Sequence, residues 1–350
     1  MTQPPDAAAD IKRLDEDTLA RYLSQHIAGF KGPLTAEKFP GGASNPTFLV
    51  TAGGKRYALR RKPSGKLLKS AHAVDREYKV MKALGGTDVP VPRMLHLCQD
   101  DSVIGSMFFV MEYLEGRIFW DPVLPDLAKD ERTKIYDEMN RVLAALHTVD
   151  VAKVGLADFG RPGSYFLRQT SRWTDQYRAS QTVKNPDIEA LIDWLANNTP
   201  PDDGRVSIVH GDYRLDNMIF SATGPRVLGV IDWEISTLGH PFSDIAYQCM
   251  QWRLPNEGAL RGLGTLDRRA HGIPTEAEYV ARYCERTGIS GIPIWTYCLV
   301  FNMFRLAAII QGVYKRGLDG NASDPVRAKK MGEAVPVLGR LAVGLLESSK

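Results

Sequence analysis

The sequence predicts an α+β protein of two lobes, with a small antiparallel-sheet N-lobe and a larger, mainly helical C-lobe. Three observations favour this class. The chain has 350 residues, which is long for one hydrophobic core. Strand-like runs gather in the first third of the chain, and helical periodicity dominates after Asp126. We expect a disordered N-terminus over residues 1–14, an N-lobe over 15–113 and a C-lobe over 114–350.

Composition and charge narrow the class of protein. Apolar residues make up 44% of the chain and charged residues 24%, which is typical of a globular protein. The net charge of +3 is too small to favour a nucleic-acid partner. The four cysteines form no CxxC pair and the first residues carry no export signal, so we expect a cytoplasmic protein with reduced thiols. Nothing in this composition indicates an oligomeric state.

The longest apolar run, "IPIWTYCLVFNMFRLAAII", raises the question of a membrane span. Asn302 and Arg305 stand in its middle. Polar and charged side chains are expensive at the centre of a bilayer, so we expect a buried helix and no membrane partner.

The N-lobe elements follow from short periodic patterns. "DEDTLARYLSQHI" places Leu19 and Leu23 on one helical face. Two alternating runs around Phe48 and Tyr57 are joined by the turn "AGGK", which predicts a hairpin. The segment 70–86 has helical spacing and ends at a pair of glycines. Two further strands are expected in "VPVPRMLHLC" and "SMFFVMEYLEG".

The C-lobe begins with three expected helices, over residues 134–150, 164–180 and 187–198. Two strand-like stretches, "SIVHGDYRLDNMIF" and "RVLGVIDW", interrupt the helical pattern, and the remainder from Asp244 is mainly helical. No internal repeat is present. Ligands tend to bind where two lobes meet, so a site is expected there.

The stretch "SIVHGDYRLDNMIF" crowds polar residues between two apolar runs. Asp212 and Asn217 are five residues apart, and Asp232 ends a second apolar strand fifteen residues after Asn217. Strand pairing would bring Asp232 beside Asn217. A carboxylate and an amide are hard oxygen ligands that suit magnesium on nucleotide phosphates, and Asp212 is then left to orient or deprotonate a hydroxyl. Taken singly, each acid could instead form a turn or a cap.

These motifs also resemble a known family. Protein kinases combine H-R-D-x-x-x-x-N with D-F-G, and the offset from Asp to Asn is the same here. "HGDYRLDNMIF" followed by "VIDWEISTLGHPFSDIAY" resembles the aminoglycoside phosphotransferase and choline kinase-like family, nearest the branch that some animals fuse to acyl-CoA dehydrogenase domains. The resemblance covers roughly residues 15–320. It implies a bilobal protein kinase-like fold that uses ATP and Mg²⁺.

The resemblance also implies roles for individual residues. Asp212 is expected to be the catalytic base, with Asn217 and Asp232 as magnesium ligands. His210 is expected to support the loop without taking part in the chemistry. Asp244 resembles the acid that hydrogen-bonds back to the catalytic loop, and it could also serve as a helix N-cap.

The N-lobe is expected to bind the nucleotide. "GGASNPTF" stands where a phosphate-covering loop belongs, although it lacks G-x-G-x-x-G and its glycines could simply form a turn. "YALR" places an arginine where kinases have the phosphate-contacting lysine, with an acid on the next helix as its partner. "FVMEYLEG" resembles the hinge, whose backbone would bind adenine. The residues concerned are Ser44, Asn45, Arg60, Glu77, Met111, Glu112 and Leu114.

The phosphate acceptor is expected to be a small molecule. Only twelve residues separate Asp232 from Asp244, which leaves no room for the activation segment of a protein kinase. The runs "LRRKPSGKLLKSAH" and "RGLGTLDRRAH" are rich in Lys and Arg, which favours an anionic acceptor such as a hydroxyacyl-CoA or a hydroxy acid. Both runs could equally be solvated faces. Speculative substrate contacts are Arg168, Arg172, Gln176, Glu234 and Arg305.

Several functions therefore stay open at this point. An ATP- and magnesium-dependent small-molecule kinase is favoured, because base, amide and metal acid occur together. An aminoglycoside phosphotransferase is the substrate alternative. A catalytically silent nucleotide-binding module and a Ser/Thr protein kinase are less well supported.

Overall fold

The structure is a computed structural model that describes residues 14–40, 45–63, 73–161, 163–257, 259–322 and 324–348. The chain divides into two compact units. Unit 1 comprises residues 1–117, 219–222 and 228–235, and unit 2 comprises 118–218, 223–227 and 236–350. Two short segments from the middle of the chain thus belong with the N-terminal part. The segment expected to be disordered, 1–14, lies outside the described residues except for Leu14.

Unit 1 is built on a five-stranded sheet in the order β1-β2-β3-β5-β4, in which each neighbouring pair is antiparallel. This confirms the predicted antiparallel sheet. Its strands are β1 (Leu34–Lys38), β2 (Thr47–Ala52), β3 (Lys55–Arg61), β4 (Met94–Cys98) and β5 (Phe108–Glu112). The β2–β3 turn uses Gly53 and Gly54, both with positive φ (57° and 73°), as a two-residue hairpin turn requires.

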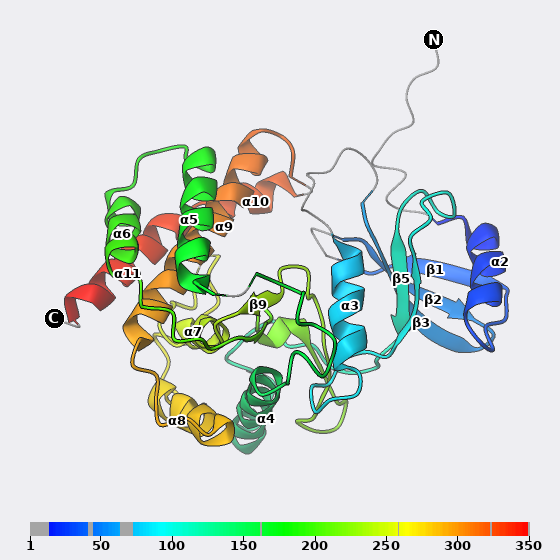
Figure 1. Cartoon of the computed structure of the whole chain (residues 1–350), viewed down its shortest axis with the longest axis horizontal. Coiled ribbons are helices and arrows are strands. Elements are labelled where there is room, and N and C mark those ends of the chain that lie inside the picture. Colours follow the sequence, from blue (N-terminus) through cyan, green and yellow to red (C-terminus); the bar gives the residue numbers. More distant parts are fainter. Residues whose placement is uncertain are drawn as a thin grey trace, which may run out of the picture. The chain divides into compact units, whose positions relative to one another are not determined.

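The two faces of this sheet are covered by different helices (Figure 1). Helix α2 (Glu16–His26) packs its buried leucines against one face, where Tyr57 and Leu59 of β3 also point. Helix α3 (Val74–Leu84) lies on the other side. Because side chains alternate along a strand, Arg60 points away from α2, toward α3.

A small two-stranded sheet of β7 (Met218–Phe220) and β8 (Val227–Val230) lies largely in unit 1. Arg117 and Phe220 exchange two backbone hydrogen bonds of 2.8 Å. The approach is close at Gly116, where an added Cβ would lie 2.1 Å from the Phe220 carbonyl oxygen. The predicted pairing of the two strands is present, and Asp232 follows β8 by two residues.

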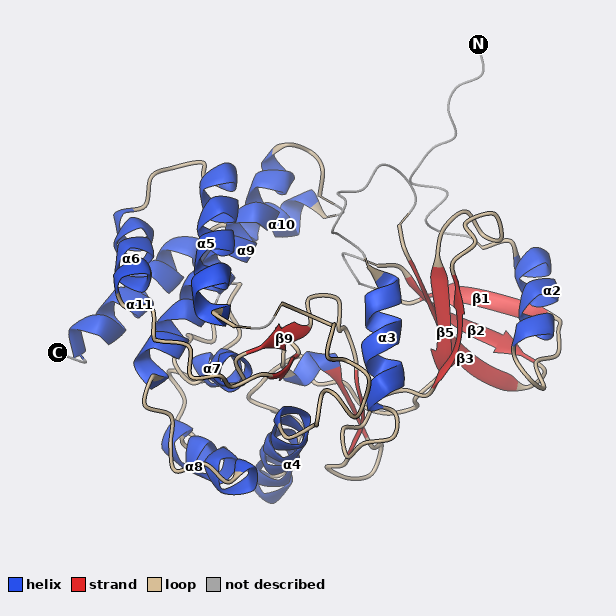
Figure 2. Ribbon diagram, viewed as in Figure 1, coloured by secondary structure: helices blue, strands red, loops and turns tan. Residues whose placement is uncertain are grey.

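Unit 2 is mainly helical (Figure 2), as predicted. Its helices are α4 (Lys129–His147), α5 (Tyr165–Ser180), α6 (Pro186–Asn197), α7 (Phe242–Met250), α8 (Glu276–Thr287), α9 (Trp295–Leu318), α10 (Pro325–Met331) and α11 (Ala334–Ser348). Helix α9 is the centre of the packing and contacts α5, α6, α7, α10 and α11. By length and composition α9 could cross a membrane, but 72% of its most apolar window is buried inside the structure. It is therefore packed as a core helix.

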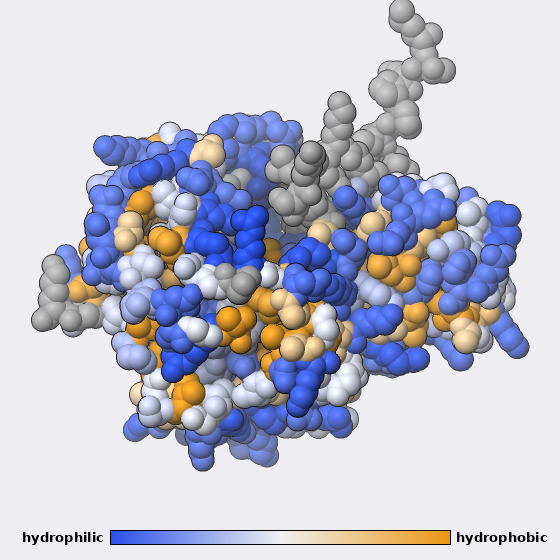
Figure 3. All heavy atoms as spheres, in the orientation of Figure 1, coloured by the Kyte–Doolittle hydropathy of each residue, from blue (hydrophilic) through white to orange (hydrophobic). Residues whose placement is uncertain are grey.

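Two short strands and one helix place the loop that carries the predicted chemistry. β6 (Ser207–Val209) pairs with β9 (Thr237–Gly239), and His210 directly follows β6. Helix α7 begins three residues after β9, and all nine of its residues are buried. On the face drawn in Figure 3, hydrophilic residues cover most of the described surface and hydrophobic ones are interspersed among them.

Candidate active site

The segment after β6 forms a tight loop that presents Asp212. Gly211 has φ +86°, a conformation that glycine adopts without strain. The Asp212 carboxylate accepts a hydrogen bond of 2.6 Å from the Tyr247 hydroxyl and one of 3.0 Å from the Asn217 amide. The Arg214 guanidinium lies 3.2 Å away. Burial alone raises the pKa of Asp212, but the Arg214 charge and these hydrogen bonds lower it overall, so the side chain is an ionised acceptor.

Asn217 stands at the end of a short 3₁₀ turn, Leu215–Asn217, immediately before β7. Its Nδ2 donates to the Asp212 backbone oxygen at 2.8 Å and to Asp212 Oδ2 at 3.0 Å. This network assigns the amide orientation, and it leaves Oδ1 as the atom turned away from Asp212. An amide oxygen held in this way fits a hard cation such as magnesium.

A buried acid holds the loop from behind. Asp244, at the start of α7, accepts from the backbone N–H of His210 at 2.6 Å and of Gly211 at 2.8 Å. These are the contacts that the family resemblance implies for this acid. Burial alone raises the pKa of Asp244, but hydrogen bonding and charge from His147 outweigh it, so the pKa is lowered. His210 is fully buried, and its Nδ1 accepts from the Asp212 N–H at 3.2 Å, which fits a scaffold role.

A second charged cluster lies in unit 1. Arg60 on β3 binds Glu77 of α3 at 3.1 Å and Asp232 at 2.6 Å, with Glu234 at 3.7 Å. The predicted Arg60–Glu77 pair is thus present. Burial raises the pKa of Glu77 to about 8, and the Arg60 charge opposes that shift. One guanidinium therefore neutralises the three neighbouring carboxyl groups only in part. The remaining negative charge suits a cation.

Asp232 has an unusual backbone conformation. Its φ of +67° is rare for a residue other than glycine. The following Trp233 is fully buried, and its indole N–H donates to the Val230 carbonyl at 2.9 Å. This anchor holds the segment after β8 in a turn that aims the Asp232 carboxylate at Arg60. Strained residues of this kind cluster at functional sites.

Each unit contains a side-chain oxygen of the kind that magnesium prefers. In unit 1, Asp232 has the carboxylate oxygen that Arg60 does not bind, and in unit 2, Asn217 has Oδ1. Among the residues that the structure describes, no group of three or more His, Cys, Asp or Glu side chains could hold a metal ion. Magnesium usually binds through only one or two protein side chains when phosphate and water complete its coordination.

One nucleotide-contact prediction needs a correction. Asn45 was expected to donate to phosphate, but it is buried, and its Nδ2 donates to Glu77 at 2.9 Å and to Glu234 at 3.4 Å. It therefore orients the acid beside Arg60. The backbone of Glu112 was expected to bind adenine, and its N–H donates to the Arg93 carbonyl at 2.9 Å. Ser44 lies outside the described residues.

The other predicted hinge residues lie at the end of β5. Met111 is buried and pairs with Ala58 of β3. Leu114 packs so closely on Gly229 of β8 that an added Cβ there would lie 2.4 Å from Leu114 Cδ1. The hinge is thus tied to the strand that leads into Asp232.

The speculative substrate contacts do not converge. Arg168 donates to the Arg161 carbonyl at 2.8 Å, and Arg172 and Gln176 are exposed on α5. Glu234 lies in the Arg60 cluster. Arg305 corrects the prediction most clearly, because it is only 4% exposed and donates to the Gly211 carbonyl at 2.6 Å. It is a neighbour of the catalytic loop, buried within the core.

The structure weakens the two basic runs, 59–72 and 261–271, as evidence for an anionic acceptor. In the run 261–271, Arg268 donates to the backbone oxygens of Trp252 and Leu263, and Arg269 pairs with Glu278. These arginines have structural partners. Of the run 59–72, residues 64–72 lie outside the described residues.

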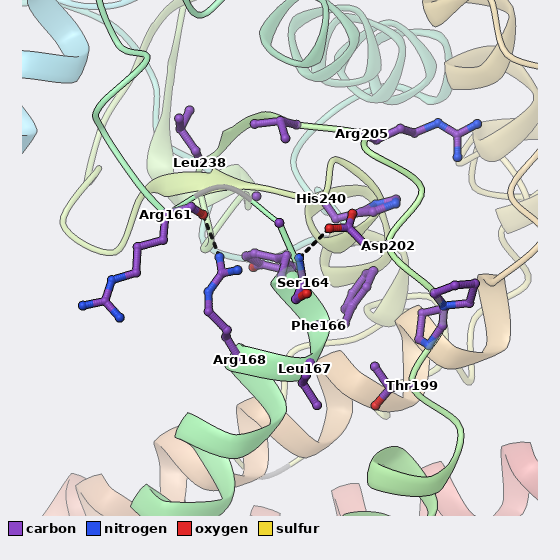
Figure 4. Close-up of a pocket in the computed structure, with 16 residues that line it drawn as sticks. Arg161, Ser164, Phe166, Leu167, Arg168, Thr199, Asp202, Arg205, Leu238 and His240 are labelled. Atoms are coloured by element: carbon purple, nitrogen blue, oxygen red, sulfur yellow. Dashed lines mark hydrogen bonds between the residues drawn. The ribbon is translucent and has the colours of Figure 1, made fainter.

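A cavity of about 100 Å³ lies beside the N-terminus of α5. Figure 4 shows Asp202 directed at the backbone of Ser164, and the Arg161 and Arg205 side chains extending away. The Ser164 N–H donates to the Asp202 carboxylate at 2.8 Å. The lining of this cavity includes none of the residues from His210 to Asn217, so the cavity is separate from the predicted catalytic loop.

Two residues of the site were not predicted from the sequence. Tyr247 binds Asp212, and His147 of α4 lies 3.5 Å from Asp244 and 2.7 Å from the Tyr283 hydroxyl. Tyr247 had a usable signal, because it stands three residues after Asp244 and so shares a helical face with it. His147 had none, since 97 residues separate it from Asp244.

The antiparallel N-terminal sheet, the helical unit and the two acidic loops define a phosphotransferase of protein kinase-like fold. The model of the "Phosphotransferase enzyme family" matches residues 35–279, and the chain belongs to this family. The family is one of phosphotransferases, which places the chain in that class of enzyme.

Known relatives place the chain more narrowly. It is 45% identical over 331 residues to the mouse "Acyl-CoA dehydrogenase family member 10", covering 94% of this chain and 31% of the relative. The chain thus spans about a third of that protein's length. A solved candidate aminoglycoside phosphotransferase from Ralstonia eutropha is 48% identical, with a TM-score of 0.88 and coverage of 96% and 99%.

A more distant solved neighbour shows a ligand set. The aminoglycoside phosphotransferase APH(4)-Ia, in a ternary complex with AMP-PNP and hygromycin B, has a TM-score of 0.60 at 16% identity, with coverage of 93% of this chain and 99% of that one. At this identity the likeness shows the fold alone.

Proposed function

We propose that this protein is an ATP- and magnesium-dependent kinase that transfers the γ-phosphate to a hydroxyl group of an anionic small molecule, with hydroxyacyl-CoA as the first candidate. The observation that carries the proposal is the Asp212 carboxylate. It is fixed by the Tyr247 hydroxyl and the Asn217 amide, and its lowered pKa keeps it ionised near neutral pH. A carboxylate held in this way can orient a hydroxyl and accept its proton.

The other residues then divide the work. Asn217 Oδ1 and the Asp232 carboxylate would hold the magnesium ion, which when bound would neutralise phosphate charge. Arg60 would bind phosphate oxygens, a role that its planar guanidinium suits. Glu77 keeps Arg60 in place from α3. The Glu112 carbonyl and the backbone of Leu114 are the proposed adenine contacts.

The acceptor is proposed from the relatives. The 45% identical mouse protein is an acyl-CoA dehydrogenase family member. Because its name indicates acyl-CoA substrates, we propose an acyl-CoA that carries a hydroxyl group as the acceptor for this chain. Aminoglycoside phosphorylation is the second candidate, because the 48% identical solved relative is described as a candidate aminoglycoside phosphotransferase. We also propose a cytoplasmic location and no membrane or nucleic-acid partner.

A screen of ATP consumption, corrected for hydrolysis without acceptor, distinguishes these candidates. The acceptors are hydroxyacyl-CoAs, free hydroxy acids and aminoglycosides. Turnover with a hydroxyacyl-CoA and none with aminoglycosides supports the proposal, and the reverse pattern replaces it with the second candidate. If no acceptor is phosphorylated and ATP with magnesium gives no thermal shift, the protein is not a kinase.

Variants then test the assigned roles. Asp212→Asn should lower kcat by about 10²–10⁴-fold with nucleotide binding retained, because the base acts on the acceptor. Asp232→Asn should instead weaken nucleotide binding only when magnesium is present. Asp193→Asn, on the exposed side of α6, is the matched control and should behave as wild type. Full turnover by Asp212→Asn would remove the base assignment.

A further inference from the structure

Helix α7 directs two side chains at the catalytic loop. Asp244 and Tyr247 stand three residues apart and therefore share one helical face. Asp244 binds the loop backbone, whereas Tyr247 reaches the base itself, with 2.6 Å between its hydroxyl and Asp212 Oδ1. Tyr247 is only 4% exposed, so its ring is fixed by packing. The orientation of the carboxylate is thus set from the core of unit 2.

Arg305 of α9 contacts both the catalytic loop and Tyr247. Its Nη2 donates to the carbonyl of Gly211, the residue just before the base, at 2.6 Å. Its guanidinium also lies over the Tyr247 ring at 5.4 Å and the Trp173 ring at 5.5 Å, measured to the ring centroids. Aromatic faces stabilise a buried cation of this kind. One side chain therefore contacts both the loop and the tyrosine that binds Asp212.

The hydrogen bonding also distinguishes the two carboxylate oxygens of Asp212. Oδ1 accepts from Tyr247 and faces Arg214, while Oδ2 accepts from the Asn217 amide. A carboxylate oxygen has room for more than one donor, so Oδ2 can also receive an acceptor hydroxyl. The buried Tyr247 hydroxyl is a steady donor, because burial and the Asp212 charge raise its pKa far above neutral pH.

We propose that Tyr247 and Arg305 are positioning residues for the proposed phosphoryl transfer: Tyr247 holds Oδ1 of Asp212 so that Oδ2 faces the acceptor hydroxyl, and Arg305 holds the Gly211 carbonyl and the Tyr247 ring. This rests on the proposed function. Each residue is only 4% exposed and contacts the catalytic loop from within the core of unit 2. Both should therefore act on kcat and leave nucleotide affinity unchanged.

Tyr247→Phe is the sharpest test, because it keeps the ring that packs against Arg305 and removes only the hydroxyl. The matched control is Tyr279→Phe, which removes another buried tyrosine hydroxyl bonded to α7, 2.6 Å from Gln248 Oε1. Tyr279 lies outside the proposed machinery. A general loosening of α7 should affect both variants alike, whereas loss of positioning should affect Tyr247→Phe alone.

Two measurements are made on wild type and both variants. The first is the ¹³C chemical shift of the labelled Asp212 carboxyl by NMR at one fixed pH near neutrality, assigned with Asp212→Asn. The second is kcat and the KM for ATP at the same pH. Because the Tyr247 hydroxyl donates to Asp212 Oδ1 at 2.6 Å, its loss should change the electronic environment of the carboxyl carbon and move this chemical shift. We expect kcat to fall about 10–100-fold, as for a lost hydrogen bond to a charged group.

Arg305 is tested by a conservative pair. Arg305→Lys keeps the charge and a donor for the Gly211 carbonyl, and Arg305→Met removes both. If Arg305 positions the loop, the lysine variant should retain several-fold more kcat than the methionine variant, with equal KM for ATP. Equal kcat in two folded variants would remove Arg305 from the proposal.

The carboxyl chemical shift separates this proposal from the proposed function. An unchanged Asp212 chemical shift in Tyr247→Phe, matching Tyr279→Phe, overturns the positioning role. Absence of phosphoryl transfer by wild type would refute the proposed function, and a changed chemical shift in Tyr247→Phe would still show that the tyrosine holds this carboxylate.

Discussion

Replacing Asp244 with asparagine should destabilise unit 2 and loosen the catalytic loop. The carboxylate is completely buried and accepts from two loop N–H groups, at 2.6 Å from His210 and 2.8 Å from Gly211. Asparagine has nearly the same shape but only one acceptor oxygen. Its NH₂ group must replace either the oxygen that accepts from Gly211 or the oxygen that accepts from His210 and lies 3.5 Å from His147, so it faces a loop N–H in both orientations.

The magnitude follows from these contacts. Each hydrogen bond to a buried carboxylate contributes about 1.5–3 kcal/mol, and an unsatisfied buried N–H costs about 1–3 kcal/mol. Removing the buried charge offsets part of this loss of stability, because burial disfavours the ionised form of Asp244. We expect a net loss of about 3 kcal/mol. For a unit of this size, that corresponds to a fall in Tm of about 6–12 °C.

Urea denaturation of wild type, Asp244→Asn and the surface control Asp193→Asn measures the loss. The measurement is repeated across pH, because Asp244 has a lowered pKa in the folded state. A group of this kind stabilises the fold above its unfolded pKa, and the contribution is lost as pH falls through the folded pKa. The difference between wild type and Asp244→Asn should therefore be constant near neutral pH and shrink below about pH 4.

A destabilisation below about 1 kcal/mol at pH 7 would refute this reasoning, since it would mean that the loop N–H groups find other acceptors at little cost. A large loss that stays constant down to acid pH would also contradict it. In that case the effect would come from packing, and the charge of Asp244 would not be its source.

Two further predictions concern unit 1. Arg60→Met should cost about 1–3 kcal/mol, because Glu77 and Asp232 lose their hydrogen-bond donor. Removing the cation should raise the pKa of Glu77 further above its value of about 8, so urea denaturation should show a larger loss at pH 8 than at pH 6; a loss independent of pH would contradict the pairing. Gly229→Ala should cost about 1–3 kcal/mol through contact with Leu114. Leu114→Ala in the same chain should restore part of it, and strictly additive losses would exclude the contact.

Much of the fold was predictable because its signals are local. The hairpin around Gly53 and Gly54, helix α3 and the helices of unit 2 have patterns within 10–20 residues. Strands β1 and β9 were missed for the opposite reason. β1 reads "LTAEK" and β9 has three residues, so neither carries a period that can be recognised, and both exist because a neighbouring strand pairs with them.

The sequence predicts site residues where a short motif or a neighbouring element indicates them. Asp212, Asn217 and Asp232 are predicted from a motif, and the Arg60–Glu77 pair, which the structure contains, is predicted from a strand next to a helix. The failures were at Asn45, which was expected to bind phosphate, and at Arg305, which was expected in a buried helix but with the substrate as its partner. Each is buried against a residue far along the chain, Glu77 for the first and Gly211 for the second. No local pattern reports such contacts.

The groups that control the base belong to one unit, and most that would bind nucleotide belong to the other. Asp244, Tyr247 and Arg305 act on the loop from the core of unit 2, whereas Arg60 and Asp232 are held within unit 1. Core substitutions in α7 and α9 should therefore alter kcat, and substitutions around α3 should alter nucleotide affinity. Asn217 is the exception, since it lies in unit 2, donates to Asp212 and is proposed as a magnesium ligand. Its replacement should change both quantities, which distinguishes it from every other residue of the site.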